Sequence, residues 1–204
     1  MTKSKAYDQA YFDRWYRHPR HRIGGAADLE RRVRMAVGVA EYCLGRPLRT
    51  VLDIGCGEGR WRAPLRRARP GVQYTGVDSS RYVVERFGRS RGIRFGQFGT
   101  LSEVGLPGPF DLVVCADMLH YLPVAELRRG LASVRALTAG IAFLEALTTA
   151  DGVAGDTTGF HRRSAAVYRR LFRTAGFTQC GPHCWAGATV AGHLAALERA
   201  GVEG

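Results

Sequence analysis

The chain has 204 residues, of which 46% are hydrophobic, 10% aromatic and 24% charged. These values are typical of one globular domain with a buried core, and we find no repeat or low-complexity tract. No apolar run approaches the roughly 20 residues that span a bilayer, which excludes a transmembrane helix. The N-terminus is polar and aromatic and lacks the apolar centre of a signal peptide, so we expect a cytoplasmic protein. Five cysteines, an odd number, fit a reducing compartment better than a disulfide framework.

The formal net charge of +12 is carried almost entirely by arginine. A basic surface can bind nucleic acid, because its cations release counterions from phosphates. Here the arginines are spread along the whole chain and form no single tract, as expected of solvated helix faces. Nucleic acid is therefore a partner that the sequence permits and does not favour.

Short apolar runs alternate along the chain with stretches of helical periodicity. We expect helices near residues 29–44, 79–88, 123–140 and 164–176. We expect strands at residues 49–55, 73–78, 93–98, 110–118 and 141–147. The fourth of these is almost continuously apolar, which indicates a central strand covered on both faces. A further strand or hairpin is expected at residues 177–185, and a last helix at residues 190–200.

Strands that alternate with helices predict an α/β fold with a doubly wound, mainly parallel sheet and helices on both faces. We expect a single domain over residues 1–204, with an N-terminal helical lid at residues 1–46 and the α/β core at residues 47–204. Right-handed crossovers place the carboxyl ends of all the parallel strands on one edge of the sheet, where ligands bind in this architecture.

The first strand runs into three alternating glycines in the stretch VLDIGCGEG. Glycines at this turn let the backbone bend tightly and approach a ligand, because no Cβ intervenes. A dinucleotide site requires Gly-x-Gly-x-x-Gly, but Gly59 comes one residue early and the bulky Trp61 follows it. Asp53, just before the loop, would also be unfavourable beside phosphates. The pattern favours a cationic or amino-bearing ligand.

The stretch VLDIGCGEG closely resembles the first motif of the class I S-adenosylmethionine-dependent methyltransferases. Asp78, in YTGVDSS, stands at the end of the second strand, where that family holds the ribose hydroxyls with an acidic residue. FDLVVCADMLHYL, residues 110–122, is similar to the fourth-strand segment of the family. The resemblance covers about residues 50–176. It implies a Rossmann-like fold, S-adenosylmethionine as methyl donor and S-adenosylhomocysteine as product.

The resemblance also implies residue roles at the cofactor. The backbone of Gly55, Cys56 and Gly57 is expected under the methionine part, and Asp53 near its amino group, through water or by fixing the loop. Asp78 is expected to bind the ribose. The remaining cofactor-binding residues that we expect are Ser79, Thr100, Asp117, Tyr11 and Trp15.

One position departs from the family pattern. The family often has an acidic residue after the third strand that accepts a hydrogen bond from the adenine amino group. In this sequence Gly99 stands there. Gln97, Thr100 or a backbone carbonyl are the alternatives for that contact.

Methyl transfer from a sulfonium is an in-line displacement in which the protein aligns the nucleophile and excludes water. A base is needed only if the acceptor loses a proton. His120, after the fourth strand, is the first candidate, because imidazole titrates near neutral pH, and a packing role is the alternative. His161 is the second candidate. Glu145 could orient an acceptor, and Arg162 and Arg163 could hold an anionic one.

The aromatic N-terminal segment offers two interpretations. Tyr7, Tyr11 and Trp15 share one face of a helix, so they either pack against the core or form a lid over the cofactor. Aromatic faces attract a sulfonium cation and exclude water. The polar loop at residues 148–163 is either a surface connection or the other wall of an acceptor pocket.

The leading functional hypothesis is methyl transfer to a small molecule. After the fourth strand there is no Asn-Pro-Pro-Tyr segment and no Pro-Cys pair of the kinds that serve amino and cytosine-carbon methylation, and we expect no appended RNA-binding domain. An RNA methyltransferase, a non-catalytic S-adenosylmethionine-binding protein and a dehydrogenase are the alternatives. CGPHC, residues 180–184, lacks a standard zinc spacing, so we expect no metal site.

Overall fold

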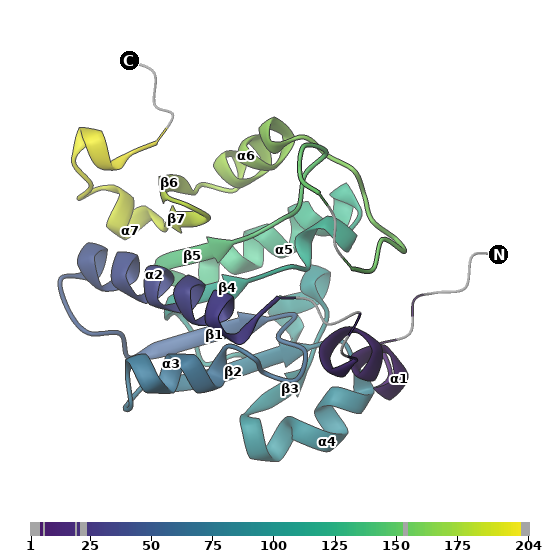
Figure 1. Ribbon diagram of the computed structural model, residues 1–204. Coiled ribbons are helices and arrows are strands. Elements are labelled where there is room, and N and C mark those ends of the chain that lie inside the picture. The colour runs from purple at the N-terminus through teal and green to yellow at the C-terminus, as the bar shows by residue number, and fades with distance from the viewer. Residues whose placement is uncertain (1–4, 6, 19, 21–23, 153–154, 201–204) are drawn as a thin grey trace.

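The structure, a computed structural model, describes residues 5, 7–18, 20, 24–152 and 155–200. Over these ranges a seven-stranded sheet has the strand order β3-β2-β1-β4-β5-β7-β6 (Figure 1). The strands are β1 (Thr50–Ile54), β2 (Gln73–Asp78), β3 (Ile93–Phe95), β4 (Phe110–Cys115), β5 (Thr138–Leu144), β6 (Thr178–Gly181) and β7 (Cys184–Ala186). Strands β1 to β5 are parallel, and β7 lies antiparallel between β5 and β6. The predicted doubly wound, mainly parallel sheet is confirmed.

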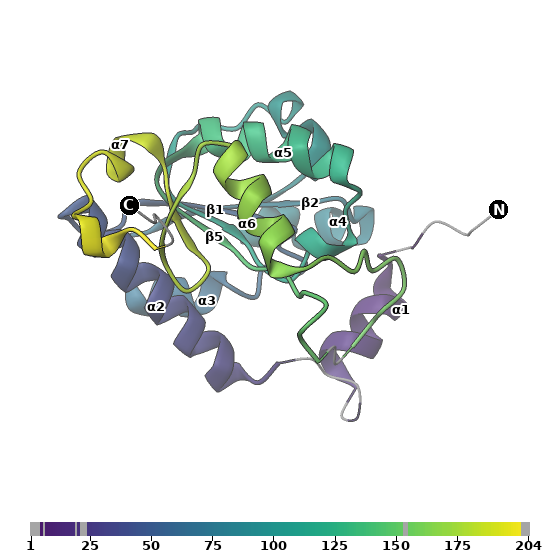
Figure 2. The same cartoon turned by 90° about the horizontal axis from the view of Figure 1, so that it is seen from above.

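Helices cover both faces of this sheet. The α-helices are α1 (Gln9–Phe12), α2 (Ala26–Leu44), α3 (Arg62–Ala68), α4 (Arg81–Arg91), α5 (Val124–Leu137), α6 (Ala165–Thr174) and α7 (Ala188–Ala191). A π-helical turn, η1 (Asp13–Arg17), follows α1, and the 3-10 turns are η2 (Phe98–Glu103), η3 (Leu119–Tyr121) and η4 (Ala196–Glu198). Figure 2 shows α2 and α3 on one side of the sheet and α5 on the other. No helix in the described ranges is long and apolar enough to cross a membrane.

The hydrophobic periodicity of the long helices accounts for their packing. In α2 the apolar face that contains Val33 and Val37 is buried in one core cluster. In α5 the face that contains Leu127, Leu131 and Val134 is buried in a second cluster on the opposite side of the sheet. Every residue of β4 is buried between the two clusters, which confirms its central position.

The centre of the sheet is its topological switch point, because the chain winds outward from β1 to β2 and β3 and then returns to β4 on the other side. The loops that follow β1 and β4 therefore meet at the carboxyl edge of the sheet. The short helix α1 lies at this edge, away from the two helical layers (Figures 1 and 2).

Several boundaries differ from those expected. Within the segment expected as a lid, residues 1–46, the apolar face of α2 packs on the sheet as part of the core, and a lid role for the residues before α2 stays a prediction. The helix expected at residues 190–200 is broken, because α7 stops at Gly192 and the extended Ala195 separates it from η4. The strand expected at residues 93–98 ends at Phe95, since Phe98 begins a 3-10 turn. The hairpin expected at residues 177–185 is confirmed as β6 and β7.

Candidate active site

The glycine loop after β1 has a backbone that only glycine adopts readily. Gly55, Gly57 and Gly59 have left-handed φ values of 66°, 51° and 75°. A Cβ atom at position 55 would lie 2.9 Å from Cγ of Met118, and one at position 57 would lie 3.1 Å from Oη of Tyr16. The three glycines therefore provide both the turn and the close approach of neighbouring groups to the loop.

Asp78, at the end of β2, is joined to this loop. Its Oδ2 accepts a hydrogen bond from the Gly57 amide at 2.7 Å, and its Oδ1 accepts one from the Ser80 amide at 2.8 Å. The side chain is buried, and burial raises the pKa of the carboxyl despite these backbone donors. Each carboxylate oxygen has capacity for a further donor. Asp78 thus fixes the glycine loop and retains acceptor capacity toward the pocket that it lines.

Asp53 lies behind the loop and is almost completely buried. Its Oδ2 accepts a hydrogen bond from the Tyr74 hydroxyl at 2.7 Å. Burial raises the pKa of the Asp53 carboxyl to about 7, although the hydrogen bond from Tyr74 opposes the shift. A role near the cofactor's amino group stays a prediction, while the contact with Tyr74 supports a role in fixing the loop.

Substitution of Asp53 should change how stability depends on pH. Its folded-state pKa of about 7 lies above the unfolded value of about 3.9. Between these pH values the folded state binds more protons than the unfolded state, so the free energy of unfolding falls as pH rises. Asp53→Asn cannot ionise and can still accept the Tyr74 hydrogen bond. We expect its melting temperature to fall less than that of the wild type between about pH 5 and pH 8. Glu103→Gln, at an exposed carboxylate, is the control, and parallel curves for Asp53→Asn and the wild type would contradict the prediction.

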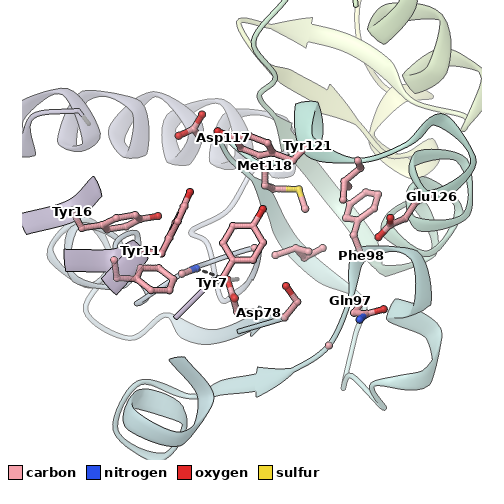
Figure 3. A pocket seen from close by; sticks show the side chains of 17 residues that line it. Tyr7, Tyr11, Tyr16, Asp78, Gln97, Phe98, Asp117, Met118, Tyr121 and Glu126 are labelled. Carbon is pink, nitrogen blue, oxygen red and sulfur yellow. Dashed lines mark hydrogen bonds between the residues drawn. The ribbon is translucent and has the colours of Figure 1, made fainter. Parts of the chain in front are cut away.

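A pocket of about 350 Å³ opens above the glycine loop and Asp78 (Figure 3). Its lining includes Gly96, Gln97, Phe98 and Glu126, and also Asp117, Met118 and Tyr121. Four aromatic residues of the N-terminal segment also line it: Tyr7, Tyr11, Phe12 and Tyr16. A smaller cavity of about 70 Å³ shares Gly55, Tyr16 and Asp117 with it and is also lined by Arg32, Asp53, Cys56 and Arg60. The volume of the larger pocket is that of a small-molecule site.

Tyr16 is the one of these four aromatic residues that lies in the π-helical turn η1. In this turn the His18 amide donates to the Asp13 carbonyl, five residues earlier, at 2.9 Å. The wider turn brings Tyr16, five residues after Tyr11, onto the pocket side. Trp15, expected there from four-residue spacing, does not line the pocket, and Arg14 lies over its ring at 5.0 Å.

Charged residues join this N-terminal segment to the rest of the site. Arg17 donates to both carboxylate oxygens of Glu58, in the glycine loop, at 2.6 and 2.8 Å. The Lys5 ammonium lies 2.6 Å from the Asp156 carboxylate and 3.7 Å from the centre of the Tyr121 ring. The N-terminal segment therefore lines the pocket and also contacts the loop between β5 and α6.

Asp117 follows β4 and lines both cavities. It has a left-handed φ of 57°, and half of its side chain is exposed. Burial, and then the nearby Glu145, raise the pKa of Asp117 to about 6, against the opposing effect of Arg32, Arg60 and Lys5. A carboxylate held in this way can accept a proton or bind a cationic group at the junction of the two cavities.

His120 is 0% exposed and lies behind Asp117. Its Nδ1 accepts a hydrogen bond from the Leu147 amide at 3.3 Å, so the neutral ring carries its proton on Nε2. Nε2 lies 3.7 Å from Oδ1 of Asp117 and has no hydrogen-bond partner among the described residues. Burial, Lys5 and Arg163 lower the pKa of His120 to about 4. At neutral pH His120 is therefore a neutral hydrogen-bond donor. Its burial and low pKa make it a weaker candidate base than Asp117.

The remaining predicted residues differ in whether they line a cavity. Ser79 lines the pocket, Cys56 lines the smaller cavity, and Thr100 lines neither. His161 is exposed and lines neither cavity; its amide donates to the His120 carbonyl at 2.8 Å. Their roles stay predictions.

Two of the residues expected to bind an acceptor, Glu145 and Arg163, make structural contacts. Glu145 accepts hydrogen bonds from Arg32 on both carboxylate oxygens, at 2.9 and 3.0 Å. Arg163 is buried and donates to the Leu122 carbonyl at 2.6 Å. In the described part of the chain, no group of three or more histidine, cysteine or acidic side chains could hold a metal ion.

Sequence reasoning missed several lining residues. Met118 and Tyr121 lie within the fourth-strand segment but carry no pattern that assigns them to a site. Glu126 lies in α5, and the sequence of this helix shows only the ordinary amphipathic pattern of a helix that packs on a sheet. The sequence gives one indication of Glu126. Gly99 stands where the family often has an acidic residue, so an acidic side chain from another element could take that place.

Comparison with known proteins supports one family. A family model described as a methyltransferase domain matches residues 52–140. Trans-aconitate 2-methyltransferase of Deinococcus radiodurans is 36% identical over 80 residues, which are 38% of this chain and 30% of that protein. An uncharacterized protein of Synechococcus is 34% identical over 98 residues, which are 45% of this chain and 22% of that protein. The matched part of the chain spans less than a third of either curated relative.

Solved structures share the fold at low sequence identity. Magnesium protoporphyrin IX methyltransferase from Synechocystis, with bound SAH, has a TM-score of 0.59 and 19% identity over 88% of this chain and 93% of that one. DesVI of Streptomyces venezuelae has a TM-score of 0.60 and 14% identity over 79% of this chain and 91% of that one. These likenesses show the fold alone, and the family-model match identifies residues 52–140 as similar to a methyltransferase domain.

Proposed function

We propose that this chain transfers a methyl group from S-adenosylmethionine to a small-molecule acceptor by in-line displacement. The observation that carries the proposal is the covered pocket, in which the glycine loop, Asp78 and an aromatic lid meet at the carboxyl edge of the sheet. The family's cofactor supplies an electrophilic methyl group on a sulfonium. The protein then has to bind, orient and exclude water.

The residues of the pocket fit that cofactor. The acceptor capacity of Asp78 suits the two hydroxyls of a ribose. Gly55 and Gly57 line the pocket without side chains, so their backbone forms part of its wall. The faces of Tyr11 and Tyr16 provide an environment that attracts a sulfonium cation.

At the acceptor side, Asp117 is the residue that we propose to hold the acceptor's nucleophilic group and, where that group is protonated, to receive its proton. Asp117 lines both cavities, so a small acceptor in the second cavity would face the first across this carboxylate. Nε2 of His120 lies 3.7 Å from Oδ1 of Asp117, too far for a hydrogen bond at the observed positions, and a small shift of either side chain would let its N–H donate to the carboxylate.

The lid favours a small acceptor. The Arg17–Glu58 and Lys5–Asp156 contacts cover the pocket on two sides, which leaves little access for a folded nucleic acid. The names of two similar proteins, trans-aconitate 2-methyltransferase and magnesium protoporphyrin IX methyltransferase, also name small molecules.

A labelling experiment tests this proposal. The purified protein is incubated with isotopically labelled S-adenosylmethionine and with separate small-molecule, RNA and protein fractions of a cell extract. We expect a labelled mass in the small-molecule fraction. Label confined to the RNA fraction would support an RNA methyltransferase instead. Binding of S-adenosylmethionine by calorimetry without label in any fraction would support a non-catalytic binding protein.

A further inference from the structure

One side of the pocket is lined by residues from two elements, η2 and α5. Figure 3 shows Glu126 of α5 beside Phe98 of η2, with Gln97 below them and Asp78 between this side and Tyr16. All five of these side chains line the pocket. A nucleoside whose ribose is held at Asp78, with its other substituent toward the glycine loop, would place its base on this side.

Two glycines allow Glu126 to reach this position. A Cβ atom at position 99 would lie 2.8 Å from Cγ of Glu126. A Cβ atom at position 130, in α5, would lie 2.1 Å from the Phe98 ring and 2.5 Å from the Phe98 carbonyl oxygen. Because both positions are glycine, η2 packs directly against α5. Glu126 then occupies the space that a side chain at position 99 would take.

The carboxylate of Glu126 is available to a ligand. Its side chain is partly exposed, and no described residue forms a hydrogen bond or ion pair with it. It also faces into the pocket. Burial is the main cause that raises the pKa of the Tyr7 hydroxyl to about 12, and the charges of Asp156, Asp78 and Glu126 add to this shift.

We propose that Glu126 recognises the adenine base of the cofactor by accepting a hydrogen bond from its exocyclic amino group. In this chain a residue of α5 thus replaces an acidic residue at the end of β3, and Gly99 makes the replacement sterically feasible. The assignment rests on the proposed function, because it requires an adenosine-containing ligand in this pocket. A carboxylate only accepts hydrogen bonds, so it selects an amino group and opposes the oxo group of hypoxanthine.

A calorimetric titration with two ligands tests the assignment. S-adenosylhomocysteine carries the 6-amino group, and S-inosylhomocysteine carries a 6-oxo group at the same position. We expect the wild type to prefer the adenosyl ligand by about tenfold or more, the scale of one charge-assisted hydrogen bond. Glu126→Gln should narrow this preference, because an amide can donate to the oxo group. Glu126→Ala should lose most of it.

Two control variants make the result specific. Glu103→Gln changes an exposed carboxylate of the same turn η2 and should keep the wild-type preference. Gln97→Ala removes the other polar side chain on this side of the pocket and should also keep it. Thermal melts establish that each variant is folded.

Two outcomes would overturn the assignment in different ways. If the wild type binds S-adenosylhomocysteine and the preference survives Glu126→Ala, or is lost in Gln97→Ala alone, then Glu126 is not the base ligand and the proposed function stands. If the wild type binds neither ligand, both the proposed function and this assignment fail.

Discussion

Asp78→Ala should reduce the affinity of the protein for S-adenosylhomocysteine by about 10-fold to 100-fold in a calorimetric titration, the scale of 1.5 to 3 kcal/mol for a hydrogen bond to a charged group. Two effects combine in this expectation. The variant removes the acceptor that we assign to the ribose hydroxyls. It also leaves the Gly57 and Ser80 amides without their acceptor, which loosens the glycine loop.

Asp78→Asn separates these two effects. The asparagine oxygen can accept from only one of the two amides at the observed positions, and its amino group opposes the other, so we expect an intermediate loss of affinity. Stability should fall more in Asp78→Ala than in Asp78→Asn, because alanine leaves both amides without an acceptor. Unchanged affinity in Asp78→Ala would show that Asp78 is not the ribose ligand. Glu103→Gln is again the control.

The sheet and the glycine loop were predictable because their signals are local. The apolar runs at β1, β2, β4 and β5 each lie within a few residues of the observed strands. The spacing of Gly55, Gly57 and Gly59 requires only the backbone of the loop itself. In both cases the residues that decide the structure are neighbours in the sequence.

The lid and the side of the pocket that contains Glu126 were less predictable, because they depend on contacts between distant segments. Tyr16 replaces Trp15 at the pocket as a result of one π-helical turn, which ordinary helical spacing does not reveal. Glu126 reaches the pocket through the packing of Gly99 and Gly130 against residues of another element. The donor character of His120 follows from its contact with the Leu147 amide, beyond β5.

Asp117→Asn should slow methyl transfer by about a hundredfold or more if the acceptor loses a proton, which is the usual contribution of a positioned base. Asparagine keeps the size of the side chain and cannot take up a proton. The affinity for S-adenosylhomocysteine should change by no more than about threefold, so that the loss lies in turnover. The measurement is the rate of label transfer into the small-molecule fraction of a cell extract, at saturating labelled S-adenosylmethionine.

The pH dependence distinguishes Asp117 from His120 as the base. A base must be unprotonated, so the rate should rise with pH through the pKa of the group that acts. Asp117, with a pKa of about 6, faces Glu145, Arg32, Arg60, Lys5 and His120, and a rise centred near this pH is the expected result. His120, with a pKa of about 4, would place the rise lower. His120→Gln should then reduce the rate less than Asp117→Asn does, because His120 acts on the acceptor only through Asp117. A profile centred near pH 4, together with a larger loss in His120→Gln, would assign the base to His120 instead.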